Sequence, residues 1–595
     1  MQPIDWLIVI GYLVLTMGLG LYTSRQTLSG RTDLFVGVRS LSWWLVGTSM
    51  AATTFSVDTP LYIAGVVGSR GISGNWEWWC FGFAHVLMIA VFARLWRRAE
   101  IVTDAELTEL RYGGQAAAVL RGTKAFLFAV PMNCIGIGYV VLAMTKVIDV
   151  LQMWQGFGLD PAIDNLKLWS VLSIGALVLL YAGFSSLWNV VVTDFFQFFL
   201  ALFGSLMVAI ASVNATGGMR SLLAQFAERP DMLSFIPAGN SSGGLGLGGA
   251  ITAISSSTFL GYVMLQWWSF RRSDGGGEFI QQLAAAKTEA EAEKAAWLFS
   301  LLHYGVRTWP WIISALAAFV LYPTLTDREL GYPLLMVDTL PPILLGIAVV
   351  SLLAAFLSTV STLVNWGATY LANDLYKRFV SPRATPGELV FIGRLASLLI
   401  VLVGGVAAFV SPDIATLFRL AIAVGTGPGL VLILRWFWWR INAASELAAI
   451  ISGFVIGALT SISPAFIIPD FGQRLLVITL ATALVWVSVL LITPPESEET
   501  LDRFYAKIRP AGWGWRSQRQ RTGLRPLQNL ALDGQRLVAA LLLLFGGMFS
   551  IGGFLLMRSL IGWIALVLAV GGGAWLRHLN KQPLFPISRP GTEDG

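Results

Sequence analysis

The apolar stretch 41–68 contains polar residues that a membrane helix would not normally carry. Its middle, Ala52-Thr53-Thr54-Phe55-Ser56-Val57-Asp58-Thr59-Pro60, holds four β-hydroxyls, one carboxylate and a proline. Pro60 cannot donate the backbone hydrogen bond owed to position 56, and irregular backbone at membrane depth is tolerated where it lines a cavity. Freed carbonyls and hydroxyls suit a hard cation. We therefore expect a broken helix here, the alternative being a kinked helix with self-satisfied hydroxyls.

A second set of hydroxyls follows helical spacing within the stretch 341–376. Ala355, Ser358, Thr359 and Thr362 recur at i, i+3, i+4 and i+7, so they share one helix face. Sodium suits several neutral oxygen donors of this kind. The alternative is a face of small residues used for helix packing.

Two further features point to a site at membrane depth. Asp194 lies early in the apolar stretch 188–212, where a carboxylate is expected to be functional unless it sits at the inner interface bound to loop backbone. The stretch 249–269 carries Gly248-Gly249 at its start and then Ser255-Ser256-Ser257-Thr258. Paired interrupted helices mark transporter sites, but hydroxyl clusters also pack helices.

The composition indicates what positions these residues. The 595 residues are 56% hydrophobic and 12% charged, about half the charge of a soluble protein. This composition excludes a soluble multidomain enzyme and a disordered chain. We predict an all-α polytopic membrane protein of about 15 transmembrane helices. The expected spans are 5–23, 41–68, 78–96, 122–150, 168–184, 188–212, 249–269, 297–322, 341–376, 388–410, 414–438, 443–463, 473–493, 535–557 and 559–577.

The basic residues predict the orientation. With the N-terminus outside, roughly 30 of the 40 Lys and Arg residues fall in inner loops and about eight outside. We therefore expect a multi-pass protein of the cell (plasma or inner) membrane with a cytoplasmic C-terminus. The net charge of +6 is attributed to these loops, with no nucleic-acid partner.

The chain is expected to divide at its polar segments. The segment 495–534 is read as a basic connector on anionic lipid headgroups. The predicted divisions are 1–40 (an extra helix and inner loop), 41–212 (a first five-helix repeat), 213–248 (an extracellular loop), 249–440 (a second repeat), 441–494 (two helices), 495–534 (the connector) and 535–595 (two helices and a tail).

Several motifs, in order, resemble the sodium:solute symporter family over the first thirteen spans. They are Asp33-Leu34-Phe35-Val36-Gly37-Val38-Arg39-Ser40-Leu41, Thr108-Glu109-Leu110-Arg111-Tyr112-Gly113, Tyr181 through Gln197, Gln281-Gln282-Leu283-Ala284-Ala285-Ala286-Lys287 and Asn373-Asp374-Leu375-Tyr376. Ser185 and Ser186 stand where the family has glycines, and the extra stretch Ser269–Glu278 obscures the gate position. The resemblance implies a LeuT-type 5+5 inverted repeat with discontinuous first and sixth core helices.

The resemblance also implies residue roles. It implies a main sodium site at Ala52, Phe55, Ala355, Ser358 and Thr359. It implies a second sodium site at Asp194, Ser358, Ser361 and Thr362, so one or two ions bind per cycle. The implied substrate residues are Thr54, Asp58, Thr59, His85, Gln266, Arg307 and Thr426. His85 could instead be a satisfied core histidine, and Arg307 could pair structurally with Asp58.

The function expected on this basis is sodium-coupled import of a small polar organic solute, like a sugar or an amino acid, by alternating access. The protein is expected to be no enzyme, to act in the lipid bilayer as a monomer, and to use sodium as its coupling ion. A membrane solute sensor on the same fold is the alternative. A channel is disfavoured, because a pore requires a continuous polar face or rings of subunits.

Overall fold

The computed structural model describes residues 1–28, 41–101, 103–155, 158–159, 165–182, 187–237, 256–277 and 279–582, and the structural statements below concern these. The motif at 33–41, the glycines at 248–249, Ser255 and Ser185–Ser186 lie wholly or partly outside them. Within the described residues the chain is helical, and its β-structure is limited to two isolated bridges. The predicted all-α class is confirmed.

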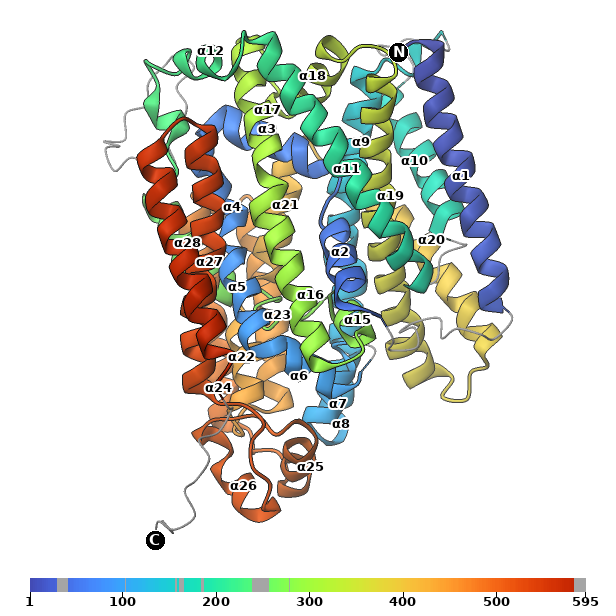
Figure 1. The fold of residues 1–595 in the computed structure, drawn as a ribbon. Helices are drawn as coiled ribbons and strands as arrows, with labels where there is room; N and C mark the ends of the chain where they lie inside the picture. Colours follow the sequence, from blue (N-terminus) through green and yellow to red (C-terminus); the bar gives the residue numbers. More distant parts are fainter. Residues whose placement is uncertain are drawn as a thin grey trace.

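The first part of the chain forms α1 and a first set of core helices (Figure 1). These are α1 (Pro3–Leu28), α2 (Trp43–Thr53), α3 (Asp58–Arg70), η1 (Ile72–Asn75), α4 (Trp76–Trp79), α5 (Phe81–Leu87), η2 (Met88–Phe92), α6 (Ala93–Ala99), α7 (Glu106–Arg111), α8 (Gly114–Leu127), η3 (Phe128–Met132), α9 (Asn133–Val150), α10 (Leu166–Ala182) and α11 (Leu187–Ala215).

A second set follows after the short segments α12 (Met219–Ala224) and η5 (Pro230–Leu233). It consists of α13 (Ser256–Leu260), η6 (Gly261–Gln266), α14 (Trp267–Ser269), α15 (Phe279–Ala285), α16 (Glu289–Ser300), η7 (Leu301–Val306), α17 (Thr308–Leu321), η8 (Arg328–Leu330), α18 (Gly331–Thr339), α19 (Leu344–Thr369), η9 (Tyr370–Val380), α20 (Pro386–Val410), α21 (Ile414–Gly425) and α22 (Gly429–Phe437).

The remaining helices lie beside and below this core. They are α23 (Ala443–Ile462), α24 (Phe471–Ile492), α25 (Glu498–Ile508), η10 (Trp513–Trp515), α26 (Arg516–Thr522), α27 (Leu530–Leu555) and α28 (Ser559–Leu579). Figure 1 shows α25 and α26 at the lower end, opposite the end where α1 begins, and α27 and α28 side by side along one flank.

Ten helices in the described part are long and apolar enough to cross a membrane, and three shorter ones are also apolar. The ten are 72–99, 114–150, 193–215, 289–321, 344–380, 386–410, 443–462, 471–492, 530–555 and 559–579. The protein is therefore a multi-pass membrane protein. The total of about fifteen crossings remains a prediction, since it counts the short and interrupted helices as well.

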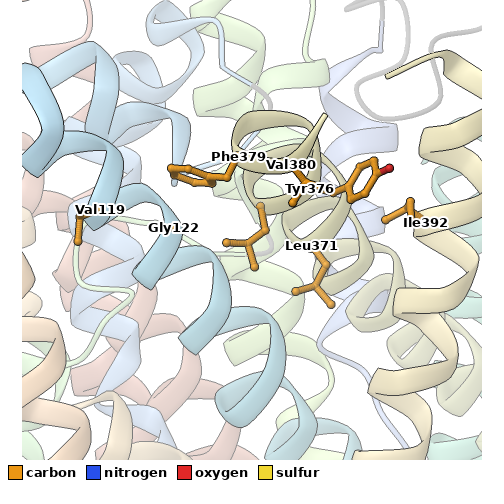
Figure 2. Close-up of a pocket in the computed structure, with 8 residues that line it drawn as sticks. Val119, Gly122, Leu371, Tyr376, Phe379, Val380 and Ile392 are labelled. Atoms are coloured by element: carbon orange, nitrogen blue, oxygen red, sulfur yellow. The ribbon is translucent and has the colours of Figure 1, made fainter. Parts of the chain in front are cut away.

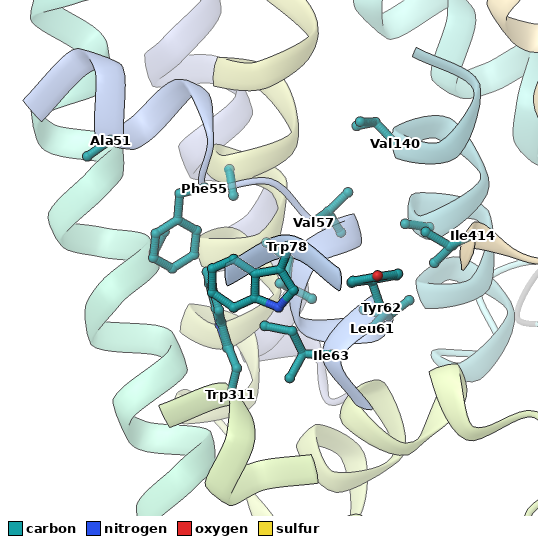
Figure 3. Close-up of a cluster of buried hydrophobic side chains, with 14 of the residues drawn as sticks. Ala51, Phe55, Val57, Leu61, Tyr62, Ile63, Trp78, Val140, Trp311 and Ile414 are labelled. Atoms are coloured by element: carbon teal, nitrogen blue, oxygen red, sulfur yellow. The ribbon is translucent and has the colours of Figure 1, made fainter. Parts of the chain in front are cut away.

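The first predicted break is confirmed. α2 ends at Thr53 and α3 begins at Asp58, so four residues separate the two half-helices. Pro60 falls in the first turn of α3, where a missing donor costs little. Asp58 lies in the same turn, where the helix macrodipole favours a carboxylate. The apolar side chains of Figure 3, among them Phe55, Val57 and Trp311, pack around this break.

The second break lies elsewhere than predicted. Ser256, Ser257 and Thr258 begin α13, and the helical path continues to Ser269. The hydroxyls of Ser257 and Thr258 donate to the carboxylate of Asp470, so they connect helices, as in the packing alternative. The helix is interrupted after Ser269, and α15 begins at Phe279. The extra stretch in the sequence is this interruption.

A further interruption divides the predicted span 414–438. α21 ends at Gly425 and α22 begins at Gly429. Gly427 has φ +115°, a conformation that only glycine adopts readily. The segment between α14 and α15 pairs with it, since Arg271 N donates to Gly425 O at 2.8 Å and Gly427 N donates to Ser269 O at 2.8 Å.

The basic segment 495–534 is folded against the helices above it. Leu501, Phe504 and Trp515 are buried in one cluster with Trp96 of α6 and Trp436 of α22. The Trp515 indole donates to Trp436 O at 2.8 Å. We call residues 495–528 the lower cap, because α25 and α26 lie at the lower end of the molecule, below α22 and α24 (Figure 1).

Candidate ion- and solute-binding site

Asp194 joins three helices at membrane depth. It lies on α11 and is fully buried. The Ser49 hydroxyl of α2 donates to its Oδ2 at 2.6 Å, and the Ser358 hydroxyl of α19 donates to its Oδ1 at 2.6 Å. Its charge therefore has hydroxyl partners and no cation within 4 Å among the described residues. The reading of Asp194 as an interface residue bound to loop backbone does not fit these contacts.

The C-terminal end of α2 is bonded to two other helices next to Asp194. The Thr359 hydroxyl donates to Thr53 O at 3.0 Å. Gln282 of α15 donates through Nε2 to the Thr53 hydroxyl at 2.9 Å and to the Ser49 hydroxyl at 3.3 Å. Both half-helices nearest the centre, α2 and α15, thus meet α19 and α11 at one polar cluster.

Ser49, Thr53 and Gln282 belong to this cluster and were not predicted as site residues. Thr53 was in the broken stretch and Gln282 in the motif at 281–287, but neither position carried a role. A polar side chain within a predicted membrane span was the feature that could have identified them.

The other predicted ion-site residues lie near this cluster. Ala52 is at the end of α2 and Phe55 in the break, and both are buried. Ala355 is on the same face of α19 as Ser358. The Ser361 hydroxyl donates to Ser358 O at 3.0 Å, whereas the buried Thr362 hydroxyl has no hydrogen-bond partner in the described part of the chain. The donor set is hard oxygen with one carboxylate, which suits sodium or another hard cation.

A cavity of about 200 Å³ lies beside the break. Five of the seven predicted substrate residues line it: Thr54, Asp58, Thr59, His85 and Arg307. Its walls are otherwise largely aromatic, with Tyr62, Trp78, Phe81, Tyr139, Phe279, Tyr304 and Phe418. A small, mostly apolar pocket with a few polar groups is typical of a site for a small molecule.

Gln266 and Thr426 do not line this cavity. Gln266 is buried at the end of η6 and donates to Glu77 O at 2.6 Å. Thr426 lies in the break after α21, where its hydroxyl donates to Ile422 O at 2.8 Å. Both side chains donate hydrogen bonds to backbone carbonyls, so we leave them out of the proposed substrate site.

His85 and Arg307 have defined partners in the cavity wall. Nδ1 of His85 lies 2.8 Å from the Tyr304 hydroxyl, so the ring is hydrogen-bonded and also faces the cavity. Arg307 donates to Ala51 O at 2.8 Å and to the Thr54 hydroxyl at 3.0 Å, and it contacts His303. Arg307 and Asp58 form no ion pair within 4 Å, so the predicted alternative of a structural pair is not observed.

Ion pairs with fully buried carboxylates lie at α4 and at α22. On the α4 side, Glu77 binds Arg419 at 2.7 Å and Arg70 at 2.8 Å. On the α22 side, Arg435 binds Asp274 at 2.7 Å and Glu446 at 2.8 Å. Each pair links a segment near a broken helix to a neighbouring helix.

A second hollow, drawn in Figure 2, differs in character. It is an open groove of about 520 Å³ between α8, η9 and α20, lined by Val119, Gly122, Leu371, Leu375, Tyr376, Phe379, Val380 and Ile392. Its polar side chain, Tyr376, is bonded to Glu388 at 2.5 Å. The other described lining residues are apolar or glycine, and none of them lines the cavity beside the break.

The broken helices and the cavity beside them, with its few polar groups, define a secondary transporter of the LeuT-like class. The profile of the sodium:solute symporter family matches residues 34–453. The chain belongs to this family and is a sodium-coupled symporter, not an enzyme.

Known proteins agree with this assignment. The chain is 24% identical to a sodium/glucose cotransporter of Vibrio parahaemolyticus over 492 residues, which are 77% of this chain and 84% of that protein. It is 24% identical to a sodium/myo-inositol cotransporter 2 of Sus scrofa over 505 residues, 77% of this chain and 69% of that protein. A solved Na+-coupled sialic acid symporter has a similar fold, with a TM-score of 0.64 at 18% identity, covering 83% of this chain and 99% of that one.

Proposed function

We propose that this protein couples the inward movement of sodium to the uptake of a small polar organic solute, at the site formed by α2, α3, α11, α15 and α19. The observation that supports this most is the cluster around Asp194, in which hydroxyls from α2 and α19 meet one carboxylate. Hydroxyls can donate to a carboxylate or turn their lone pairs to a cation. The same groups therefore serve the site with and without the ion.

Two sodium positions are proposed. The main one would use the carbonyls of Ala52, Phe55 and Ala355 with the hydroxyls of Ser358 and Thr359. The second would use Asp194 with Ser358, Ser361 and Thr362. The contact of Thr359 with the end of α2 and the partnerless hydroxyl of Thr362 support these assignments.

The solute would bind in the adjoining cavity. Thr54, Asp58, Thr59, His85 and Arg307 would supply its polar contacts, and the aromatic walls its apolar ones. Cavity size and the names of the sodium/glucose and sodium/myo-inositol relatives support a solute of sugar or amino-acid size.

Sodium would favour the state that binds the solute. An ion shared between α2 and α19 binds best in the arrangement that holds these helices together, so it shifts the population toward that arrangement. The solute must then raise sodium affinity by the same factor as sodium raises solute affinity. The N-terminal end would face outside and the lower cap the cytoplasm, as the basic residues predict.

Uptake into proteoliposomes tests the function. Radiolabelled sugars, polyols and amino acids are offered with an inward sodium gradient, and the control is the same gradient of potassium. We expect at least one solute to accumulate only with sodium, and to lose accumulation when an ionophore removes the gradient. Equal uptake in sodium and potassium for every transported solute would contradict sodium coupling.

A further inference from the structure

Arg307 is a buried cation whose described hydrogen-bond partners are all uncharged acceptors or a histidine. Its side chain is fully buried. The guanidinium bonds to Ala51 O and the Thr54 hydroxyl, contacts His303, and lies over the rings of Phe55 and Trp311 at 5.5 and 5.4 Å. Its Nε has no hydrogen-bond partner among the described residues. A guanidinium at this depth is normally paired with an anion, and no described carboxylate lies within 4 Å.

Asp58 is the corresponding anion in the same cavity. It is 8% exposed and lies in the first turn of α3. Its Oδ1 has no hydrogen-bond partner, and no described cation lies within 4 Å of it. The cavity therefore presents a guanidinium and a carboxylate that do not satisfy one another.

A neutral polyol would leave the charge of Arg307 without a counter-charge. An occupant with a carboxylate would supply it, because guanidinium and carboxylate form strong charge-assisted and often bidentate hydrogen bonds. Asp58 would then accept a hydrogen bond from a hydroxyl or an ammonium elsewhere on the same molecule. Arg271 and Arg272 also line the cavity from the segment after α14, so its described lining holds three arginines and one carboxylate.

We propose that the solute of this symporter is a small carboxylic acid whose carboxylate binds Arg307 and whose hydroxyl or ammonium group binds Asp58. This rests on the proposed function and specifies its substrate class. The cavity of about 200 Å³ is below the roughly 300–1,000 Å³ of drug-sized pockets, so the acid is small. Sugar acids and amino acids both fit this chemistry.

Matched pairs of solutes that differ in the carboxylate test the proposal. The thermal unfolding of the purified full-length protein is followed in sodium with glucuronate against glucose, and with amino acids against their amides. We expect stabilisation by at least one acid and none by its neutral partner. Stabilisation by glucose or by an amide equal to that by the acid would overturn the proposal, as would no response to any acid.

Variants locate the carboxylate. In Arg307→Gln we expect the apparent affinity for the acid to fall by a factor of about 30 or more, as for truncation of one partner of a buried charge pair. Arg307→Lys should lose less, because it keeps the charge. The control is Arg474→Gln, which removes a guanidinium bound to Ile468 O outside the cavity and should leave acid binding unchanged.

The two proposals can fail separately. Sodium stabilisation without any solute, retained in Arg307→Gln, shows that the variant is folded and its ion site intact. Wild-type affinity for the acid in that folded variant overturns the role of Arg307. If the variant does not fold, the comparison of acids with their neutral partners on the wild-type protein still tests the proposed substrate class. Acid binding that does not depend on sodium would contradict the proposed function and leave the substrate class standing.

Discussion

Asp194 connects three helices that lie far apart in the sequence. Its carboxylate accepts hydroxyls from residues 145 and 164 positions away. Because a hydroxyl can rotate from donating a hydrogen bond to presenting a lone pair, a cation could take the place of these hydrogen bonds while each hydroxyl keeps its proton. Each residue then contributes to holding α2, α11 and α19 together as well as to binding the ion.

Thr359→Val removes the hydrogen bond between α19 and α2 while leaving the packing of the side chain nearly unchanged. Valine keeps the shape but leaves the carbonyl of Thr53 without its donor, which costs about 1–3 kcal/mol for a buried group. We expect a lower thermal midpoint and a higher sodium concentration for half-maximal stabilisation.

Thr369→Val is the matched control, since that hydroxyl bonds to Asn365 O of its own helix at 2.7 Å. It should leave the sodium response as in the wild type. Equal losses of sodium response in both variants would refute a specific role for Thr359.

At the scale of elements, the three helix breaks differ in how well they can be predicted from the sequence. Pro60 and Asp58 indicated the first, because each conflicts locally with a continuous apolar helix. The second depends on tertiary contacts: Asp274 binds Arg435, 161 residues later. The third, at Gly427, had local turn residues on both sides, but the surrounding hydrophobicity favoured one unbroken span.

Gly427→Ala should destabilise the third break. The residue has φ +115°, and an added Cβ would lie 2.7 Å from the side chain of Thr482. The strain of such a conformation is of order 1–3 kcal/mol, so we expect a clearly lower thermal midpoint. Gly547→Ala on α27 meets nothing within 4 Å and should not lower it. No difference between these variants would contradict the described backbone at Gly427.

The lower cap is predicted to be an integral part of the fold. Phe504 is 1% exposed and Trp513 is 87% exposed within the same segment. Phe504→Ala should therefore cost about 3–5 kcal/mol, whereas Trp513→Ala should cost little. Hydrogen exchange of the backbone amides of residues 495–528 measures how stably the cap is folded. Fast exchange in the wild type, or no increase in Phe504→Ala, would indicate that the cap is not packed as described.

For the whole molecule, the sequence was sufficient where a residue conflicted with its surroundings. Low charge content and apolar spans indicated the class, and Asp194, Asp58 and Arg307 stood out against them. The sequence was insufficient where function depends on pairing over long separations. Gln282 lies 229 residues from Thr53, and nothing local in either residue identifies the other.

The orientation can be tested by labelling single cysteines in intact cells. Both native cysteines are buried, so they should react little. Ala227→Cys and Ser517→Cys place thiols at exposed positions near the α12 end and in the lower cap. We expect a membrane-impermeant maleimide to label position 227 only. Labelling of position 517 from outside, with 227 protected, would reverse the proposed topology.

The central claim is that sodium binds where the end of α2 meets α11 and α19. A sodium titration of thermal stability, at constant ionic strength with choline as the replacement, tests it without knowledge of the solute. Sodium at 100 times its dissociation constant should stabilise the wild type by about 2.7 kcal/mol for each site. Ser358→Ala alters both proposed positions and should lose most of this stabilisation. Asp194→Asn should lose the share that the second position contributes. Ser351→Ala, whose hydroxyl bonds to Ala348 O of its own helix, should keep the full response. A wild type that does not respond to sodium, or an Asp194→Asn variant that responds fully, would contradict the account.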